Sequence, residues 1–327
     1  MATADQLKAL IRSHADGDDE RFFSIAMQVA AHAARTGHTK LAQDVKDLID
    51  AAKQRSDASV VAKHKPTPVV QPRGELAGLL SVAYPKTHLA EMALDPQLRA
   101  KLERVLREQR ERDRLQAHGL DPQRKLLLIG PPGTGKTLTA SALAGELGLP
   151  LFTIQLHALI SRFMGETAAK LRLVFDALKQ TRAVYLFDEF DAVGVDRAAS
   201  NDVGEMRRVL NSFLVLLEQD DSDSLIVGAT NHPALLDRAL FRRFDTLIEY
   251  TLPTPEQARQ VMQSRLAILK TAHVDWAKAV AAADSLAHAE IAQACDLSAK
   301  DAILDDEPEV PTEYLVRSLN ERRTART

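Results

Sequence analysis

The segment from Gly130 to Thr137, Gly-Pro-Pro-Gly-Thr-Gly-Lys-Thr, has the residue types and spacing of a phosphate-binding loop. Its glycines let consecutive backbone N–H groups turn inward around phosphate oxygens, and the start of a following helix adds positive potential. Lys136 is suited to hold the β- and γ-phosphates, and the Thr137 hydroxyl is suited to ligate Mg²⁺. A turn that merely links strand to helix would not explain why Lys and Thr follow directly. The segment predicts ATP and Mg²⁺ as cofactors, bound by Gly130, Pro131, Pro132, Gly133, Thr134, Gly135, Lys136, Thr137 and Leu138.

Two carboxylates, Asp188 and Glu189, follow directly on the apolar run 183–187. Acids at the end of a strand are, by themselves, usually solvated caps. About fifty residues after a phosphate loop, the pair resembles a Walker B motif. In that motif Asp188 contributes to the cofactor site by reaching Mg²⁺ through water, and Glu189 polarises the attacking water. The pair therefore predicts hydrolysis of ATP, with Glu189 as a catalytic residue.

Short apolar runs alternate with helical segments from Lys125 onward. The elements that they form must position the phosphate loop and the two carboxylates. The runs cover 126–129, 151–156, 183–187, 225–229 and 246–251. Their continuous apolar character indicates strands buried on both faces, hence a parallel sheet wrapped by helices. We predict an α/β P-loop fold with five parallel strands over residues 75–252. After Pro253 and Pro255 only helical pattern remains, which predicts a helical lid over 253–327.

Before this region the pattern is helical and then breaks down. Residues 1–55 show three-and-four spacing of apolar residues with capping signals, which predicts a small helical bundle. Residues 56–74 are polar and include Pro66, Pro68 and Pro72, a composition that predicts a flexible linker. The bundle is therefore expected to form a separate domain that contacts a partner or an adaptor.

The composition of the 327 residues excludes several classes of protein. With 42 basic and 45 acidic side chains, the net charge of −3 gives no bulk attraction to nucleic acid or to anionic membranes. The single cysteine, Cys295, cannot form an internal disulfide. No apolar run approaches the roughly 18 to 20 residues that span a bilayer, and the first residues lack a secretion signal. We expect a cytoplasmic protein with no membrane association.

Residues 76–322 resemble the AAA proteins proper, the branch of AAA+ that contains katanin, spastin, the endosomal-sorting disassembly ATPases and the membrane-protease ATPases. The stretches 228–231 and 236–245 carry this resemblance together with the two motifs above. It implies that Asn231 is sensor 1, which helps to position water beside the γ-phosphate. It also implies that Arg242 and Arg243 act as arginine fingers on the ATP of a neighbouring subunit. A finger supplied in trans requires a neighbour, so we expect a homo-oligomer, a hexamer in this family.

The stretch Ser161–Glu166 resembles the family's pore loop, in which Arg162, Phe163 and Met164 would grip an extended polypeptide. An aromatic residue beside a methionine usually indicates core packing, but Arg162 and Gly165 on either side favour an exposed turn. The polar segment 197–205 is a candidate second pore loop. The lid departs from the family over 286–291, where a stretch of small residues with a glycine ahead of an Asp-Ile pair is usual. For His288 in this stretch, both an adenine or ribose contact and a surface histidine at a helix start remain open.

Three functions compete at this point. The first is ATP-driven remodelling, unfolding or threading of a protein substrate through a hexameric ring. The second is a nucleic-acid-directed ATPase such as a loader or helicase, which the aromatic pore signature and the acidic balance disfavour. The third, a switch that does not hydrolyse ATP, is disfavoured by Glu189 and the two arginines. The chain is also similar to small bacterial AAA ATPases encoded beside a separate protease, including subtilisin-like ones in antiphage defence. It has no His-Glu-x-x-His zinc signature, so any proteolysis would come from a partner protease.

Overall fold

The computed structural model describes residues 71–325 except for 160–165, 190–202 and 237. The chain divides into two units, residues 1–66 and 67–327. The predicted helical domain over 1–55 lies outside the described residues, as does the predicted linker up to residue 70. The four predicted boundaries, at 55, 74, 252 and 327, stay predictions.

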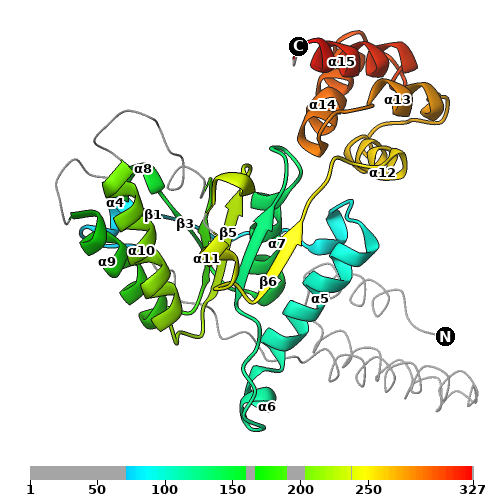
Figure 1. Ribbon diagram of the computed structural model, residues 1–327. Helices are drawn as coiled ribbons and strands as arrows, with labels where there is room; N and C mark the ends of the chain where they lie inside the picture. Colours follow the sequence, from blue (N-terminus) through cyan, green and yellow to red (C-terminus); the bar gives the residue numbers. More distant parts are fainter. Residues whose placement is uncertain (1–70, 160–165, 190–202, 237, 326–327) are drawn as a thin grey trace, which may run out of the picture. The chain divides into compact units, whose positions relative to one another are not determined.

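A six-stranded sheet forms the centre of the described α/β region (Figure 1). Its strand order is β1-β3-β4-β5-β2-β6, with β1 antiparallel to β3 and every other pair parallel. The strands are β1 (Leu80–Ala83), β2 (Lys125–Ile129), β3 (Leu151–Ile154), β4 (Val184–Phe187), β5 (Leu225–Thr230) and β6 (Thr246–Glu249). The predicted parallel sheet is confirmed.

The prediction of five strands was wrong because it missed the edge strand β1. This strand has four residues, and of these only Leu80 is fully buried. Ser81 interrupts its apolar residues, so β1 lacks the continuous apolar run by which the other strands were found. The other five strands lie where the apolar runs predicted them.

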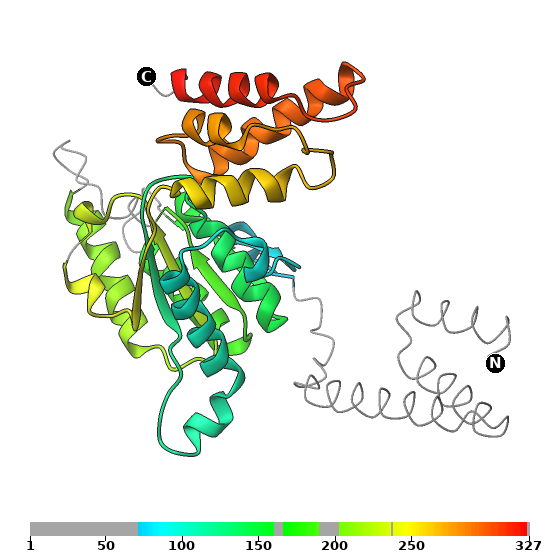
Figure 2. The ribbon, with the colours of Figure 1, turned by 90° about the vertical axis from the view of Figure 1, so that its right-hand side faces the viewer.

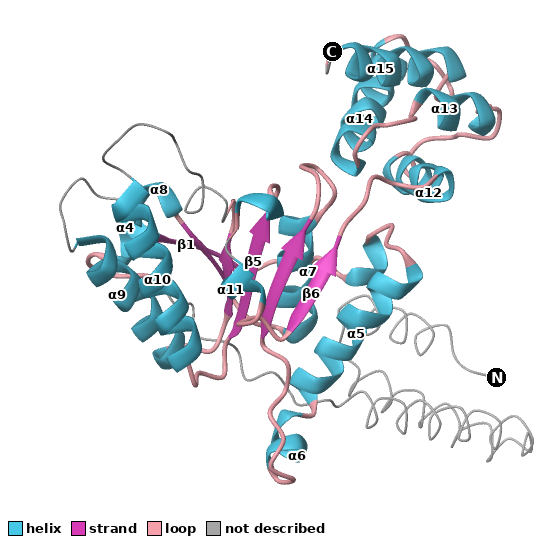
Figure 3. Ribbon diagram, viewed as in Figure 1, coloured by secondary structure: helices cyan, strands magenta, loops and turns pink. Residues whose placement is uncertain are grey.

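Helices cover both faces of the sheet (Figure 3). Because side chains alternate along a strand, Leu126 and Leu128 of β2 pack with α5 and α7, whereas Leu127 and Ile129 pack with α9 and α10. The helices of this region are α4 (Leu76–Leu79), η1 (Leu89–Glu91), α5 (Pro96–Arg110), α6 (Arg112–Gln116), α7 (Lys136–Leu147), α8 (Leu156–Leu159), α9 (Glu166–Gln180), α10 (Val203–Gln219), η3 (Pro233–Leu235) and α11 (Arg238–Phe241). Two apolar layers thus hold the central strands in place.

Four helices with their own apolar cluster follow the sheet (Figure 2). They are α12 (Pro255–Arg265), α13 (Trp276–Ala282), α14 (His288–Leu304) and α15 (Thr312–Thr324). Thr254 starts α12 with a capping box, since its hydroxyl accepts from the N–H of Gln257 and its own N–H donates to the Gln257 side chain. Leu266, Ile291 and Leu315 are fully buried among these helices. The segment predicted as a lid is therefore helical.

Candidate nucleotide-binding and hydrolysis site

The phosphate loop lies between β2 and α7, as its sequence context requires. β2 ends at Ile129 and α7 begins at Lys136. Gly135 caps the helix with φ 104°, a conformation that side chains rarely adopt. The start of an α-helix presents backbone N–H groups and positive potential, so the start of this 12-residue helix is suited to phosphate oxygens.

Lys136 folds back into the curve of the loop. Its side chain is 6% exposed, and Nζ donates to the carbonyl oxygens of Gly130 (2.7 Å) and Pro131 (2.8 Å). The buried Thr134 hydroxyl donates to the same Pro131 oxygen at 2.8 Å. The loop thus surrounds a positive charge, which is what a phosphate group requires.

The two predicted magnesium ligands lie in contact although 51 residues separate them. Oγ1 of Thr137 donates to Oδ2 of Asp188 at 2.7 Å. The other oxygen, Oδ1 of Asp188, accepts from the backbone N–H of Glu189 at 2.9 Å. Hydroxyl and carboxylate oxygens are the donors that Mg²⁺ prefers, so the residues present fit this cation.

Glu189 follows Asp188 with an unusual backbone. Its φ is 50°, in the left-handed region, and its side chain is exposed. A non-glycine residue there costs on the order of 1–3 kcal/mol, and such strain concentrates at functional sites. The turn takes Glu189 out of the line of β4. The sequence analysis predicted Glu189 as catalytic but did not predict the strain.

Asn231 follows β5, which lies between β2 and β4 in the sheet. The backbone N–H of Gly130 donates to the carbonyl oxygen of Thr230 at 3.3 Å, which ties the phosphate loop to the end of β5. Carboxyl ends of parallel strands share one edge of a sheet, so the structure brings the phosphate loop, the carboxylate pair and Asn231 to the same edge.

Arg242 and Arg243 do not join this group. Both arginines are exposed in the turn between α11 and β6. Two residues after Arg243, the backbone N–H of Asp245 donates to the carbonyl oxygen of Lys125 at 2.8 Å. Lys125 is the first residue of β2, whereas the phosphate loop follows its last residue. A five-residue strand spans about 13 Å between its ends, so the two arginines stand near the opposite edge of the sheet. Arg243 forms an ion pair of 2.9 Å with Glu218 of α10.

The start of α14 contacts the tip of the phosphate loop, and the sequence did not predict this contact. The N–H of Ala289 donates to the carbonyl oxygen of Gly133 at 2.9 Å. A Cβ at Gly133 would lie 3.2 Å from the Cβ of Ala287 and 3.3 Å from that of Ala289. The signal available was the run of small residues on either side of His288.

His288 is held between this contact and the segment before α5. Burial lowers the pKa of its imidazole, although a hydrogen bond with the backbone of Ala93 opposes this shift. Among the described residues Nδ1 has no hydrogen-bond partner, so Nε2 must make the bond to Ala93. The ring is therefore neutral near pH 7, with Nδ1 as a buried acceptor.

Comparison with known proteins relates this geometry to a family. The family profile described as ATPase family associated with various cellular activities (AAA) matches residues 126–252. An uncharacterized AAA family ATPase of Sinorhizobium fredii, y4kL, is 30% identical over 326 residues, covering 100% of this chain and 97% of that protein. The chain belongs to the AAA family of ATPases. Like other members, this AAA ATPase binds nucleotide and hydrolyses ATP.

Two other relatives share only part of their length with this AAA ATPase. The ATP-dependent zinc metalloprotease FtsH 4 of Sphaerobacter thermophilus is 37% identical over 176 residues, 52% of this chain and 27% of that protein. A proposed 26S proteasome regulatory subunit homolog of Methanothermobacter marburgensis is 32% identical over 205 residues, 61% of this chain and 55% of that protein. The chain thus spans between about a quarter and about half of these two proteins.

Several predicted features lie outside the described part of this AAA ATPase. Arg162, Phe163 and Met164, the pore-loop residues, fall within the undescribed segment 160–165. Of the candidate second pore loop, residues 197–202 are also undescribed, and 203–205 form the start of α10. Within the described ranges, no helix is both long and apolar enough to cross a bilayer. The same ranges contain no cluster of three or more His, Cys, Asp or Glu side chains that could hold a metal.

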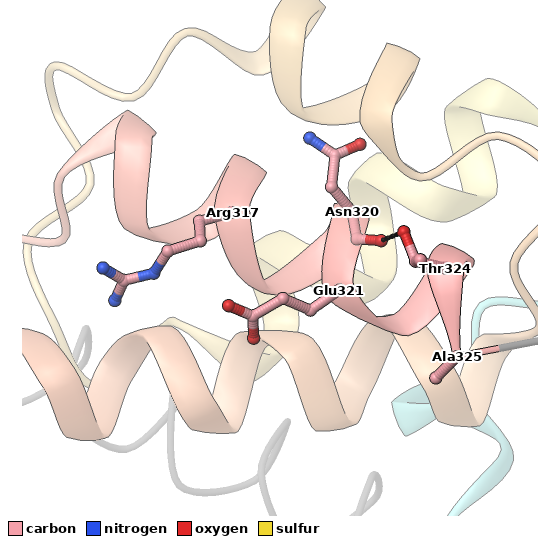
Figure 4. Close-up of a pocket in the computed structure, with 5 residues that line it drawn as sticks. All are labelled: Arg317, Asn320, Glu321, Thr324 and Ala325. Carbon is pink, nitrogen blue, oxygen red and sulfur yellow. Dashed lines mark hydrogen bonds between the residues drawn. The ribbon is translucent and has the colours of Figure 1, made fainter.

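A shallow pocket on α15 has no comparable chemistry (Figure 4). Its lining comes from one helix and the residue after it: Arg317, Asn320, Glu321, Thr324 and Ala325. Arg317 pairs with Asp301 at 2.6 Å, and the Thr324 hydroxyl donates to the carbonyl oxygen of Asn320 at 3.0 Å. These bonds lie within the helical region itself, so the pocket is not part of the site described above.

Proposed function

We propose that this AAA ATPase cleaves ATP at a site shared between two copies of the chain, in a hexameric ring that remodels, unfolds or threads protein. The observation that carries the proposal is the position of Arg242 and Arg243. They lie near the sheet edge opposite to the phosphate loop of their own chain. They are exposed, so they are free of the core and can serve the nucleotide of a neighbour.

The residues at the carboxyl edge have complementary roles in this proposal. Lys136 and the N–H groups of the loop bind the phosphates, while Thr137 and Asp188 hold Mg²⁺. When bound, Mg²⁺ neutralises charge on the phosphate oxygens. Glu189 accepts a proton from the water that attacks the γ-phosphorus, and Asn231 orients that water. The new bond joins the water oxygen to phosphorus as the bond to the β–γ bridging oxygen breaks.

A mixing experiment tests the shared site. Arg243→Ala subunits keep an intact phosphate loop, and Lys136→Ala subunits keep the arginine, so each lacks what the other supplies. We expect each variant alone to lose ATP turnover, by about 10³-fold or more for the arginine. An equal mixture should regain turnover well above the sum of the two. Arg259→Ala, at an exposed position of α12, is the control and should behave as wild type. A mixture without recovery would argue against a site completed in trans.

The proposal of a protein substrate is supported by the relatives and by one loop. Zinc metalloproteases and a proteasome regulatory subunit homolog, by their names, belong to protein degradation. The resemblance of 161–166 to a pore loop gives Phe163 the task of gripping the polypeptide. We expect an unfolded protein, and not DNA, to raise the ATP turnover of the full chain. Phe163→Ala should keep basal turnover and lose this stimulation. Stimulation by DNA with steep salt dependence would instead support a nucleic-acid-directed ATPase.

We further propose that residues 1–55 bind a partner protein, which is either an adaptor or a separate protease. The proposal rests on the helical pattern of this segment and on the linker that follows it. Co-expression of the full chain with a protease encoded beside it should yield a complex, and removal of residues 1–55 should abolish that complex. An unchanged complex after the deletion would place the partner site elsewhere.

A further inference from the structure

Tyr250, one residue beyond β6, touches the phosphate loop at its first residue. Its N–H donates to the carbonyl oxygen of Ile129 at 2.7 Å, directly before the loop begins. A side chain at Gly130 would meet the carbonyl oxygen of Tyr250 and would lie 2.8 Å from its Cβ. Only glycine leaves room for this approach. The backbone of Tyr250 thus defines where the loop starts.

The side chain of Tyr250 reaches the other end of the same loop. Its hydroxyl lies 2.6 Å from Oγ1 of Thr139 in α7. Oγ1 of Thr139 in turn donates to the carbonyl oxygen of Gly135 at 3.0 Å. Both side chains are buried, Thr139 completely and Tyr250 to within 5%. Gly135 is the last residue before Lys136, so Tyr250 contacts one end of the loop directly and is linked to the other end through Thr139.

The hydrogen bonds of Tyr250 with Thr139 and of Thr139 with Gly135 form a relay, and its direction follows from counting protons. A threonine hydroxyl has a single proton, and Thr139 donates it to Gly135. Oγ1 of Thr139 must therefore accept from the hydroxyl of Tyr250. Burial raises the pKa of the Tyr250 phenol well above its usual value, so the phenol keeps its proton. The relay runs from Tyr250 through Thr139 to Gly135, and each bond in such a chain strengthens the next.

We propose that Tyr250 is a positioning residue for nucleotide binding, which fixes the separation of the two ends of the phosphate loop through the Thr139 relay. It acts on the loop and does not touch the nucleotide. Four residues later Thr254 caps α12, so Tyr250 is also where the connection to the helical segment meets the loop. The proposal rests on the family's ATPase activity and is independent of the ring and of the protein substrate.

Nucleotide affinity of the full chain tests this role. Tyr250→Phe keeps the ring and removes only the hydroxyl, and Thr139→Val removes the middle of the relay at constant shape. We expect each to weaken ADP binding, measured by calorimetry, about three- to tenfold, the range for one lost hydrogen bond. The KM for ATP should rise in the same proportion, with little change in kcat. Thr139→Ser keeps a hydroxyl and should restore wild-type affinity.

A matched tyrosine separates positioning from simple stabilisation. Tyr185 is fully buried in β4, and the single proton of its hydroxyl is shared between the carbonyl oxygens of Ala177 (2.9 Å) and Thr181 (3.2 Å), away from the loop. Tyr185→Phe should lower the unfolding temperature of the nucleotide-free protein without changing ADP affinity. If both Phe variants lowered stability and neither changed ADP affinity, Tyr250 would have only a structural role.

The double variant Tyr250→Phe/Thr139→Val tests the relay a second way, because the second substitution should raise the unfolding temperature instead of lowering it further. Thr139→Val alone leaves the Tyr250 hydroxyl buried without an acceptor, which is the costly case. Removing that hydroxyl as well should raise the unfolding temperature above that of Thr139→Val, while ADP affinity stays that of the weaker single variant. Independent, multiplying losses of affinity would overturn the relay. Failure of the wild-type chain to bind ADP would instead contradict the ATPase assignment itself.

Discussion

At the scale of single residues, Glu189 combines a chemical and a conformational requirement. Its carboxylate follows Asp188, whose two oxygens are occupied by Thr137 and by the N–H of Glu189 itself. Its φ of 50° is one that glycine adopts without strain. A residue selected for stability alone at this position would be glycine. The retained strain supports the proposed role of the Glu189 carboxylate.

Substitution of Glu189 separates the two requirements. Glu189→Gln should bind ATP and lose turnover by about 10²-fold or more, because the amide cannot accept a proton. Glu189→Gly should also lose turnover, but it should be more stable than Glu189→Ala by about 1 kcal/mol, because glycine removes the left-handed strain. Urea unfolding and ATP turnover of the three variants provide the measurement. Equal stability of the Gly and Ala variants would mean that the backbone at this position is not strained.

His288 predicts a dependence of stability on pH. Burial lowers its pKa in the folded chain below the value of about 6.5 in the unfolded chain, so the unfolded state binds a proton more readily. The contribution of the neutral imidazole is present above pH 6.5 and decreases as the pH falls below it. His288→Gln should therefore show a smaller loss of stability between pH 7.5 and pH 5.5 than wild type in urea unfolding. The exposed His118→Gln is the control. Identical pH profiles for His288→Gln and wild type would contradict this origin.

At the scale of elements, α7 is fixed by a contact that its sequence does not announce. Gly145 lies inside this helix, where alanine would ordinarily be better by about 0.5–1 kcal/mol. A Cβ at Gly145 would meet the carbonyl oxygen of Thr87 and would lie 3.2 Å from that of Pro85. The glycine is therefore needed for the approach of the segment before α5 to the helix that begins at Lys136.

A pair of glycine substitutions tests this packing. Gly145→Ala should lower the free energy of unfolding despite the gain in helix propensity, because backbone must shift to admit the methyl group. Gly78→Ala, in α4 with open space around it, should raise the free energy of unfolding by up to about 1 kcal/mol. Urea unfolding of both variants checks the signs. A stabilised Gly145→Ala would show that α7 is less closely packed than described.

The sequence predicts those features that depend on a residue type at one position or on a local run of apolar residues. The phosphate loop, the carboxylates after β4 and Asn231 after β5 were all placed from residue type and apolar pattern. The strand β1 was missed because Ser81 interrupts its apolar residues, and the relay from Tyr250 was missed because 111 residues separate Tyr250 from Thr139. Contacts between distant segments depend on how the strands order themselves, and a local pattern does not contain that order.

At the scale of the whole chain, the described residues contain their own apolar clusters. Two clusters cover the two faces of the sheet and a third fills the helical segment, and together their members extend from Leu79 to Leu319. Each central strand is buried on both sides within this region. A chain limited to residues 71–327 therefore has the apolar contacts that a folded unit needs.

Removal of residues 1–70 tests this independence. The shortened chain should unfold cooperatively and should hydrolyse ATP at a rate that rises with protein concentration, as a site shared between copies requires. Sedimentation with and without ATP, alongside turnover, provides the measurement. Full turnover by a species that remains a monomer at every ATP concentration would contradict the shared site.

The ion pair between Arg243 and Glu218 has a bearing on assembly. Both side chains are about half exposed, so their attraction is screened by solvent and is worth at most about 1 kcal/mol. In a single copy the Arg243 guanidinium is therefore held only by a weak ion pair with Glu218. In the proposed ring, the triphosphate bound to the adjoining copy would carry several negative charges, and so would attract the guanidinium more strongly than one carboxylate does. In the proposed ring, the release of Arg243 from Glu218 would be a small barrier to subunit docking. High salt should lower this barrier further, because it screens the ion pair.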